Sequence, residues 1–288
     1  MKESKNDRIF GIFNIILLVI AALIIILPFY YVVIISFTDP TEYLAKQGFV
    51  FFLNKPSLAS YKYLLSTSTF KRATSVNIFI TIIGTMLSLI VTAAFAYGLS
   101  RKRLVGRRVL QFIVLITLIF DPGIIPNYLV VRNLKLIDNI WSLIIPTLTS
   151  GWYIILMKNF FDSMPTELEE AALIDGCTDA GVFFKIILPL SAAALSAFGL
   201  FFAVGYWNTF FKAILYINSP EKWPLQVLLQ NMLIDSVTSE AGQEGGEMPP
   251  AETIKMAAVI ISTLPILFVY PFLQKNFTKG ILIGSVKG

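Results

Sequence analysis

The 288-residue sequence contains no histidine and a single cysteine, Cys177. Histidine is the commonest metal ligand and general base in proteins, so metal and acid-base chemistry lack their usual residue. One cysteine excludes an internal disulfide framework. Charged residues are also scarce, at 14% of the chain against about 25% in soluble domains. We therefore expect no catalytic, metal or cofactor site in this chain, and no ordinary soluble fold.

Apolar residues are abundant instead, at 56% of the chain with a mean hydropathy of +0.74. A helix needs about 20 apolar residues to cross the hydrocarbon core of a membrane. Charge-free runs of that order predict five membrane spans, at Ile9–Thr38, Ala73–Ser100, Asn139–Met157, Ile186–Phe211 and Met256–Gln274. A sixth span, Val109–Val131, contains an Asp-Pro-Gly sequence that should bend or break the helix. The sequence therefore predicts an all-α integral membrane protein with six transmembrane helices.

Basic residues predict the orientation, because lysine and arginine near helix ends stay in the cytoplasm. The loop RKRLVGRR, residues 101–108, has five basic residues and no acidic one. Six spans then place both termini in the cytoplasm and Ala213–Ile254 outside, where six acidic residues oppose one basic residue. The basic residues of the first outer loop argue against this orientation. We therefore expect the basic residues behind the net charge of +5 to set the orientation of the helices in the membrane and not to bind nucleic acid.

A polar segment, ELEEAALIDGCTDAGVFFKIILP (residues 167–189), separates two of the apolar runs. The capping-box pattern Thr166-x-x-Glu169 predicts a helix from Thr166 to about Ile174, which the following Asp-Gly pair should end. Thr178 can cap a second helix that leads into the next span. The segment is therefore predicted to be a helical hairpin on the cytoplasmic side.

The composition of this hairpin favours a docking surface over a solvated loop. Its small residues let another surface approach the backbone closely, and its glutamates offer negative charge to a basic partner. A helix that lies in a partner's groove is a general mode of recognition, and a short helix joined to a membrane span can transmit a displacement.

The segment EAALIDGCTDAGVFFKIILP resembles the E-A-A-x3-G-x9-I-x-L-P signature of ABC importer permeases, with no mismatch in spacing. The matching residues are Glu170, Ala171, Ala172, Gly176, Ile186, Leu188 and Pro189. The resemblance implies that they form a coupling helix, which docks in a groove of a cytoplasmic ATPase subunit. It also implies a type I importer permease fold in one domain, residues 1–288, with a core at about 73–275, a coupling hairpin at 166–188 and a cytoplasmic tail at 275–288.

Further stretches, IIPNYLVV, NLKLIDNIWSLIIP, WNTFFKAILYI, WPLQVLLQ and the final GSVKG, are similar to the maltose-type branch of these permeases, and to its members for complex or acidic oligosaccharides such as aldouronates. This implies a second homologous permease subunit, two ATPase subunits that hold ATP and Mg, and an extracellular binding protein or lipoprotein that delivers an oligosaccharide. It also implies the cytoplasmic membrane of a bacterium. The chain has no Walker A sequence, so ATP must be hydrolysed elsewhere.

Two groups of residues are candidates for the substrate path. Asp121 is the only acidic residue of the sequence that falls within a predicted span. It could face a cavity there, or cap a helix near the membrane surface. The GYWNTFF sequence offers Tyr206, Trp207 and Asn208, which could stack on a sugar and bind its hydroxyls, or could anchor the helix at the interface. The segment AGQEGGEMPP is predicted to be an external loop that could contact the binding protein.

Three alternatives differ from this interpretation. An ABC permease for amino acids or phosphate would share the hairpin but not the maltose-type stretches. A secondary transporter would need ion-coupling residues and internal repeats. A membrane-anchored enzyme would need a catalytic constellation, which a histidine-free chain does not offer.

Overall fold

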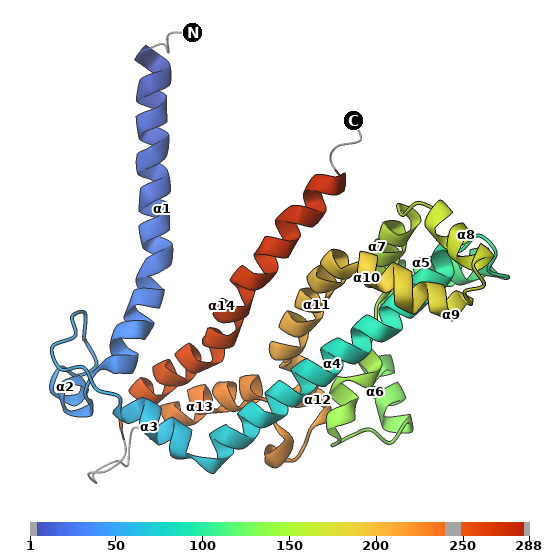
Figure 1. The fold of residues 1–288 in the computed structure, drawn as a ribbon. Helices are drawn as coiled ribbons and strands as arrows, with labels where there is room; N and C mark the ends of the chain where they lie inside the picture. Colours follow the sequence, from blue (N-terminus) through green and yellow to red (C-terminus); the bar gives the residue numbers. More distant parts are fainter. Residues whose placement is uncertain (1–4, 240–248, 285–288) are drawn as a thin grey trace. The chain divides into compact units, whose positions relative to one another are not determined.

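A computed structural model describes residues 5–239 and 249–284 of the chain, with side chains described in 10–232 and 249–268. The described residues are almost entirely helical, and Thr38 and Pro56 form an isolated antiparallel bridge. Figure 1 labels the helices along the chain, which divides into two compact units. The first unit comprises the residues up to Phe70 and Leu229–Leu264, and the second comprises Lys71–Leu228 and the residues from Pro265 onward.

The first unit begins with the long helix α1. Its helices are α1 (Lys5–Phe37), α2 (Pro40–Ala45), α3 (Ala59–Ser66), most of α13 (Leu225–Ser239) and the first part of α14 (Ala251–Gly284). The side chains of α1 between Phe10 and Phe29 are exposed and mainly apolar, which suits a helix surrounded by lipid or by a partner helix. Ser60 on α3 donates a hydrogen bond to Thr253 on α14 over 2.9 Å, which joins the two ends of this unit.

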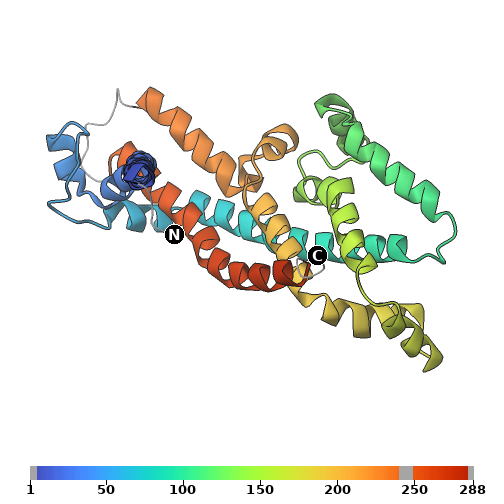
Figure 2. The same cartoon turned by 90° about the horizontal axis from the view of Figure 1, so that it is seen from above.

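The second unit is built around α4 (Ser68–Ser100), and Figure 2 shows α11 crossing it. The other helices of this unit are α5 (Arg107–Ile119), α6 (Ile124–Asn133), η1 (Ile140–Leu143), η2 (Ile145–Thr147), α7 (Gly151–Asp162), α8 (Glu167–Ile174), α9 (Asp179–Val182), η3 (Phe183–Ile187), α10 (Leu188–Leu190), α11 (Ala192–Trp207), α12 (Phe211–Tyr216) and η4 (Pro220–Lys222). Its core contains aromatic side chains of α4, α7 and α11, among them Tyr97, Phe161 and Phe202.

In the described residues, three of the six predicted spans match helices long and apolar enough to cross a membrane, or five if each bent pair of helices counts as one span. Three are single helices, Phe10–Phe37, Ser68–Ser100 and Ala251–Phe268. Two are bent pairs: Ile140–Thr147 meets Gly151–Asp162 at 48°, and Asp179–Leu190 meets Ala192–Trp207 at 82°. The six-span count therefore remains a prediction.

The sixth predicted span is interrupted where its sequence indicated a break. Helix α5 ends at Ile119 and α6 begins at Ile124. Asp121 lies in the gap, is exposed, and accepts a 2.9 Å hydrogen bond from the backbone N–H of Gly123. Gly123 has φ +81°, a conformation that glycine adopts without strain. This contact supports the turn-capping interpretation of Asp121.

Asp138 joins two loops of the second unit. Its carboxylate accepts hydrogen bonds from the backbone N–H of Asn218 and from both the backbone and the hydroxyl of Ser219, and it pairs with Lys222 over 2.8 Å. The Lys222 ammonium and the Ser219 hydroxyl hold the pKa of this carboxyl well below its usual range. The loop before η1 is thereby fixed to the loop before α13.

Candidate functional site

The hairpin of residues 166–188 has the helix boundaries that its sequence predicts. Helix α8 ends at Ile174, and Gly176 takes the left-handed conformation with φ +82°. The Thr178 hydroxyl accepts a 3.2 Å hydrogen bond from the N–H of Gly181 and caps α9 as expected. The chain then continues through the π-helical turn η3 and α10 into the bend before α11.

The predicted capping box is wrong. Thr166 has helical dihedral angles and makes no side-chain cap, and the Glu169 side chain turns away from it. Glu169 is buried, with 6% of its surface exposed, and is bound by Tyr97, Arg101 and Arg103. Two guanidinium partners compensate a buried carboxylate better than a single backbone N–H does, so the ion pairs prevail over the cap.

These contacts anchor the hairpin to the end of α4, beside which α8 and α9 lie in Figure 1. The Tyr97 hydroxyl donates to Glu169 over 3.1 Å, and the Arg101 guanidinium lies 4.6 Å from the centre of the Tyr97 ring. Arg103 also pairs with Asp179 at the start of α9. Glu169 is thus an internal anchor rather than a charge for a partner. The sequence analysis missed this role of Glu169, because it used the arginines of the basic loop only to predict orientation in the membrane. The absence of an acidic residue within that loop was the signal that its arginines need a partner elsewhere.

The seven signature residues fall into two groups. Ala172 is buried in the core, and Ile186 and Leu188 pack against it half-buried. Exposed are Glu170, Ala171, Gly176 and Pro189. The first group holds the hairpin on the membrane helices, and the second leaves the outer face of the hairpin open.

A hollow of ≈ 460 Å³, lined by charged and apolar side chains, lies between the hairpin and the basic loop. Arg101, Lys102 and Arg103 contribute to one side of it, and Glu170 and Leu173 of α8 to the other. Its lining thus combines basic, acidic and apolar side chains.

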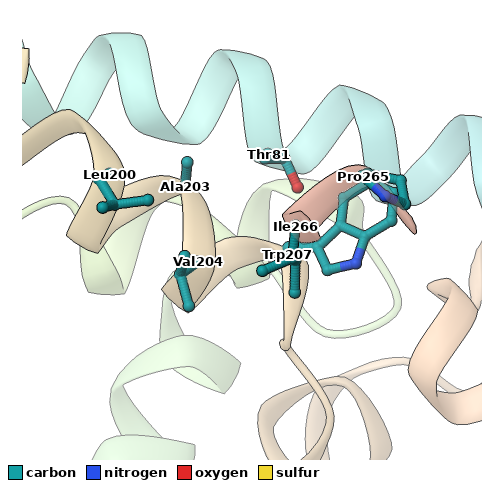
Figure 3. A pocket seen from close by; sticks show the side chains of 7 residues that line it. All are labelled: Thr81, Leu200, Ala203, Val204, Trp207, Pro265 and Ile266. Atoms are coloured by element: carbon teal, nitrogen blue, oxygen red, sulfur yellow. The ribbon is translucent and has the colours of Figure 1, made fainter. Parts of the chain in front are cut away.

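The three adjacent path candidates diverge. Tyr206 is buried, its hydroxyl 2.9 Å from that of Ser88. Trp207 faces a small apolar pocket of ≈ 70 Å³ together with Thr81 of α4 and Pro265 of α14 (Figure 3). Asn208 is exposed and bonds its own helix at Val204. Successive residues of a helix point in different directions, so these three do not converge on one ligand.

A second cavity, of ≈ 380 Å³, lies on the Tyr206 side of α11. We call it the central cavity. Its wall combines aromatic rings, hydroxyls and one charged group: Tyr153, Phe201, Phe202 and Tyr206; Thr147, Thr149, Ser150 and Thr209; and Lys212. Sequence reasoning missed Lys212, although it is the only charged residue between Lys185 and Glu221.

The part of the chain that the structure describes holds no group of three or more acidic or cysteine side chains placed to bind a metal ion. The predicted external loop AGQEGGEMPP lies largely outside the described residues, since 240–248 are not described. In the tail, the backbone is helical to Gly284 and residues 285–288 lie outside the described part.

Residues 1–283 match the family described as binding-protein-dependent transport system inner membrane component. The chain belongs to this family. The predicted importer-permease class and all-α permease fold are thereby confirmed. Family membership also makes the chain a transport subunit and a component of the inner membrane.

Two relatives from Bacillus subtilis (strain 168) match over most of their length. The polygalacturonan/rhamnogalacturonan transport system permease protein YtcP is 47% identical over 258 residues, which is 88% of this chain and 89% of that protein. Protein LplC is 46% identical over 290 residues, covering 100% of this chain and 98% of that protein.

A solved structure has the same fold. It is a chain of a bacterial ABC transporter involved in the import of the acidic polysaccharide alginate. The TM-score is 0.87 at 36% identity, with 96% of this chain and 99% of that chain covered.

Proposed function

We propose that this chain is one permease subunit of an ATP-driven importer for acidic oligosaccharides. The observation that carries the proposal is the open face of an anchored hairpin, which presents Glu170, Ala171 and Gly176 in a chain of the binding-protein-dependent family. The substrate class rests on the relatives, whose names specify polygalacturonan and alginate. Both are chains of uronic acids.

The partners follow from this role. A second, homologous permease subunit completes the path, and two ATPase subunits bind ATP with Mg and dock on the coupling hairpins. An extracellular binding protein or lipoprotein delivers the oligosaccharide. Both termini and the hairpin lie in the cytoplasm, on the side that the basic loop at residues 101–108 selects.

The structure offers two routes from the hairpin to the membrane helices. Through Glu169, helix α8 is bound to Tyr97 and Arg101 at the end of α4. Through η3 and α10, the hairpin continues into α11. Helices α4 and α11 meet again where Tyr206 packs against Gly84. A displacement of α8 by closing ATPase subunits would therefore reach both helices that meet at Tyr206.

ATP can drive this change only if it binds one conformation of the assembly better than the other. The hairpin must then carry that difference in binding free energy from the ATPase to the permease.

Substitution at Gly176 tests the docking role. A Cβ atom at Gly176 would meet nothing within 4 Å in this chain, and asparagine tolerates the left-handed conformation. We therefore expect Gly176→Asn to leave the permease inserted and folded, while the added side chain blocks an approaching ATPase. ATP-dependent uptake into liposomes and copurification of the ATPase should each fall by about tenfold or more, the effect of losing about 1.4 kcal/mol of binding.

Gly106→Asn is the matched control. Gly106 is also left-handed, with φ +76° and open space around it, but lies in the basic loop outside the hairpin. We expect it to keep uptake and association. Full uptake by Gly176→Asn would refute the docking role. Uptake of no uronate oligosaccharide by the wild-type assembly would refute the substrate class.

A further inference from the structure

Among the residues that the structure describes, Lys212 is the one charged residue in the wall of the central cavity. It lies in the first turn of α12, directly after the aromatic stretch that follows α11. With the residues that the structure describes, Lys212 makes no ion pair or side-chain hydrogen bond. The Lys212 side chain is exposed, and nearby protein atoms remove enough of its hydration to lower its pKa. An anion that enters the cavity would therefore meet an ammonium with no protein counter-charge, which it would stabilise.

The other walls of the cavity suit a carbohydrate. The centroid of the Tyr153 ring lies 4.6 Å from that of Phe202 and 6.4 Å from that of Phe201, so aromatic rings gather on one wall of the cavity. Aromatic faces pack against the C–H faces of sugar rings, while hydroxyl groups such as those of Ser150 and Thr209 exchange hydrogen bonds with sugar hydroxyls. The volume of ≈ 380 Å³ falls within the range of about 300–1,000 Å³ found for ligand pockets.

We propose that Lys212 binds a carboxylate of the passing oligosaccharide while the aromatic wall of the central cavity holds the sugar ring, so that this residue selects acidic over neutral sugars inside the membrane subunit. The inference rests on the proposed import function and adds a specificity residue to it.

The test compares uptake of an oligogalacturonate with that of its carboxyl-reduced, neutral counterpart of equal length. The full assembly is reconstituted in liposomes with wild-type, Lys212→Gln or Lys212→Arg permease. Lys212→Gln should lower uptake of the acidic sugar about tenfold or more, the usual effect of losing a hydrogen bond to a charged group. Uptake of the neutral sugar should stay the same or rise, and Lys212→Arg should keep uptake of the acidic sugar. Lys62→Gln, at an exposed lysine of α3, is the matched control and should change neither.

Chemical rescue provides a second readout. It tests the role of the charge even where the wild type imports no neutral sugar. Lys212→Cys in a Cys177→Ser background leaves one thiol in this chain. Treatment with aminoethyl methanethiosulfonate rebuilds a lysine-like ammonium and should restore uptake of the acidic sugar. Methyl methanethiosulfonate adds no charge and should not.

Three results would overturn the inference. Equal loss of both sugars in Lys212→Gln would mean a structural role or contact with lipid phosphate. Unchanged uptake of the acidic sugar would mean that Lys212 does not meet the substrate. Equal rescue by both reagents would show that size, not charge, matters. Each leaves the import function standing, whereas a wild-type assembly that imports neither sugar would overturn both proposals.

Discussion

At the scale of residues, Tyr206 shows how close packing fixes a group in the central cavity. Its ring lies against Gly84 of α4, where an added Cβ would come within 2.6 Å of the ring. Its hydroxyl is held near Ser88 of α4 and Thr147 of η2. The sequence made Tyr206 a candidate for binding sugar or for anchoring the helix at the membrane interface. The structure gives it a second role, since it joins three elements around the cavity.

We predict that Gly84→Ala destabilises the permease, because the Tyr206 ring cannot withdraw without leaving its hydroxyl partners. Overpacking of this kind typically costs about 1–3 kcal/mol. The measurement is the midpoint of thermal unfolding in detergent, which should fall.

Gly98→Ala on the same helix is the matched control, because its Cβ would meet nothing within 4 Å. It should leave the midpoint unchanged or raise it slightly, since alanine favours helix over glycine by about 1 kcal/mol. Equal midpoints for Gly84→Ala and Gly98→Ala would contradict the packing argument.

At the scale of elements, one buried carboxylate adds polar contacts to the apolar packing that holds the hairpin in place. Only 8% of the Glu169 side chain and 14% of the Arg101 side chain are exposed. Because the hairpin has few other polar contacts with α4, we expect this cluster to contribute strongly to how tightly α8 is bound to the membrane helices.

We predict that Glu169→Gln loosens the hairpin, because it leaves the buried Arg101 without its carboxylate and Arg103 with Asp179 alone. Removing one partner of a buried pair costs about 3 kcal/mol. Hydrogen exchange in residues 167–188 should become faster, and ATP hydrolysis should be less tightly linked to uptake.

Glu167→Gln is the control within the same helix, since Glu167 is exposed. It should leave exchange unchanged. Arg101→Gln should reproduce the effect of Glu169→Gln, and the double variant should cost less than the sum of the two. Strict additivity would argue against a direct pair.

At the scale of the whole molecule, orientation in the membrane determines what each surface does. The hairpin can meet a cytoplasmic ATPase only if the basic loop at residues 101–108 is cytoplasmic. The acidic segment at 213–254 then faces the side from which a binding protein delivers substrate.

We predict that a thiol at Glu221 reacts with a membrane-impermeant maleimide from outside, whereas a thiol at Lys102 reacts only after the membrane is permeabilised. Both variants, Glu221→Cys and Lys102→Cys, are made in the Cys177→Ser background, and both sites are exposed. The reverse pattern of labelling would invert the topology, and labelling of both from outside would disprove the six-span arrangement.

The sequence by itself determined the features that depend on local chemistry or on composition. Long apolar runs specified membrane helices, Asp121 to Gly123 marked the break between α5 and α6, and Gly176 and Thr178 set the turn of the hairpin. The apolar runs act through their composition, whereas the break and the hairpin turn depend on backbone preferences within a few residues. The spacing of the signature residues indicated the family, which the comparison of residues 1–283 confirmed.

Only the tertiary structure decided which side chains meet. Glu169 finds Arg101, 68 residues away, instead of the helix cap that its local pattern predicted. Tyr206 and Trp207 are adjacent in sequence but face different pockets. Lys212 lines the same cavity as aromatic rings from α7 and α11. A buried charge takes the partner that best compensates its desolvation, and that partner is chosen by how the helices pack.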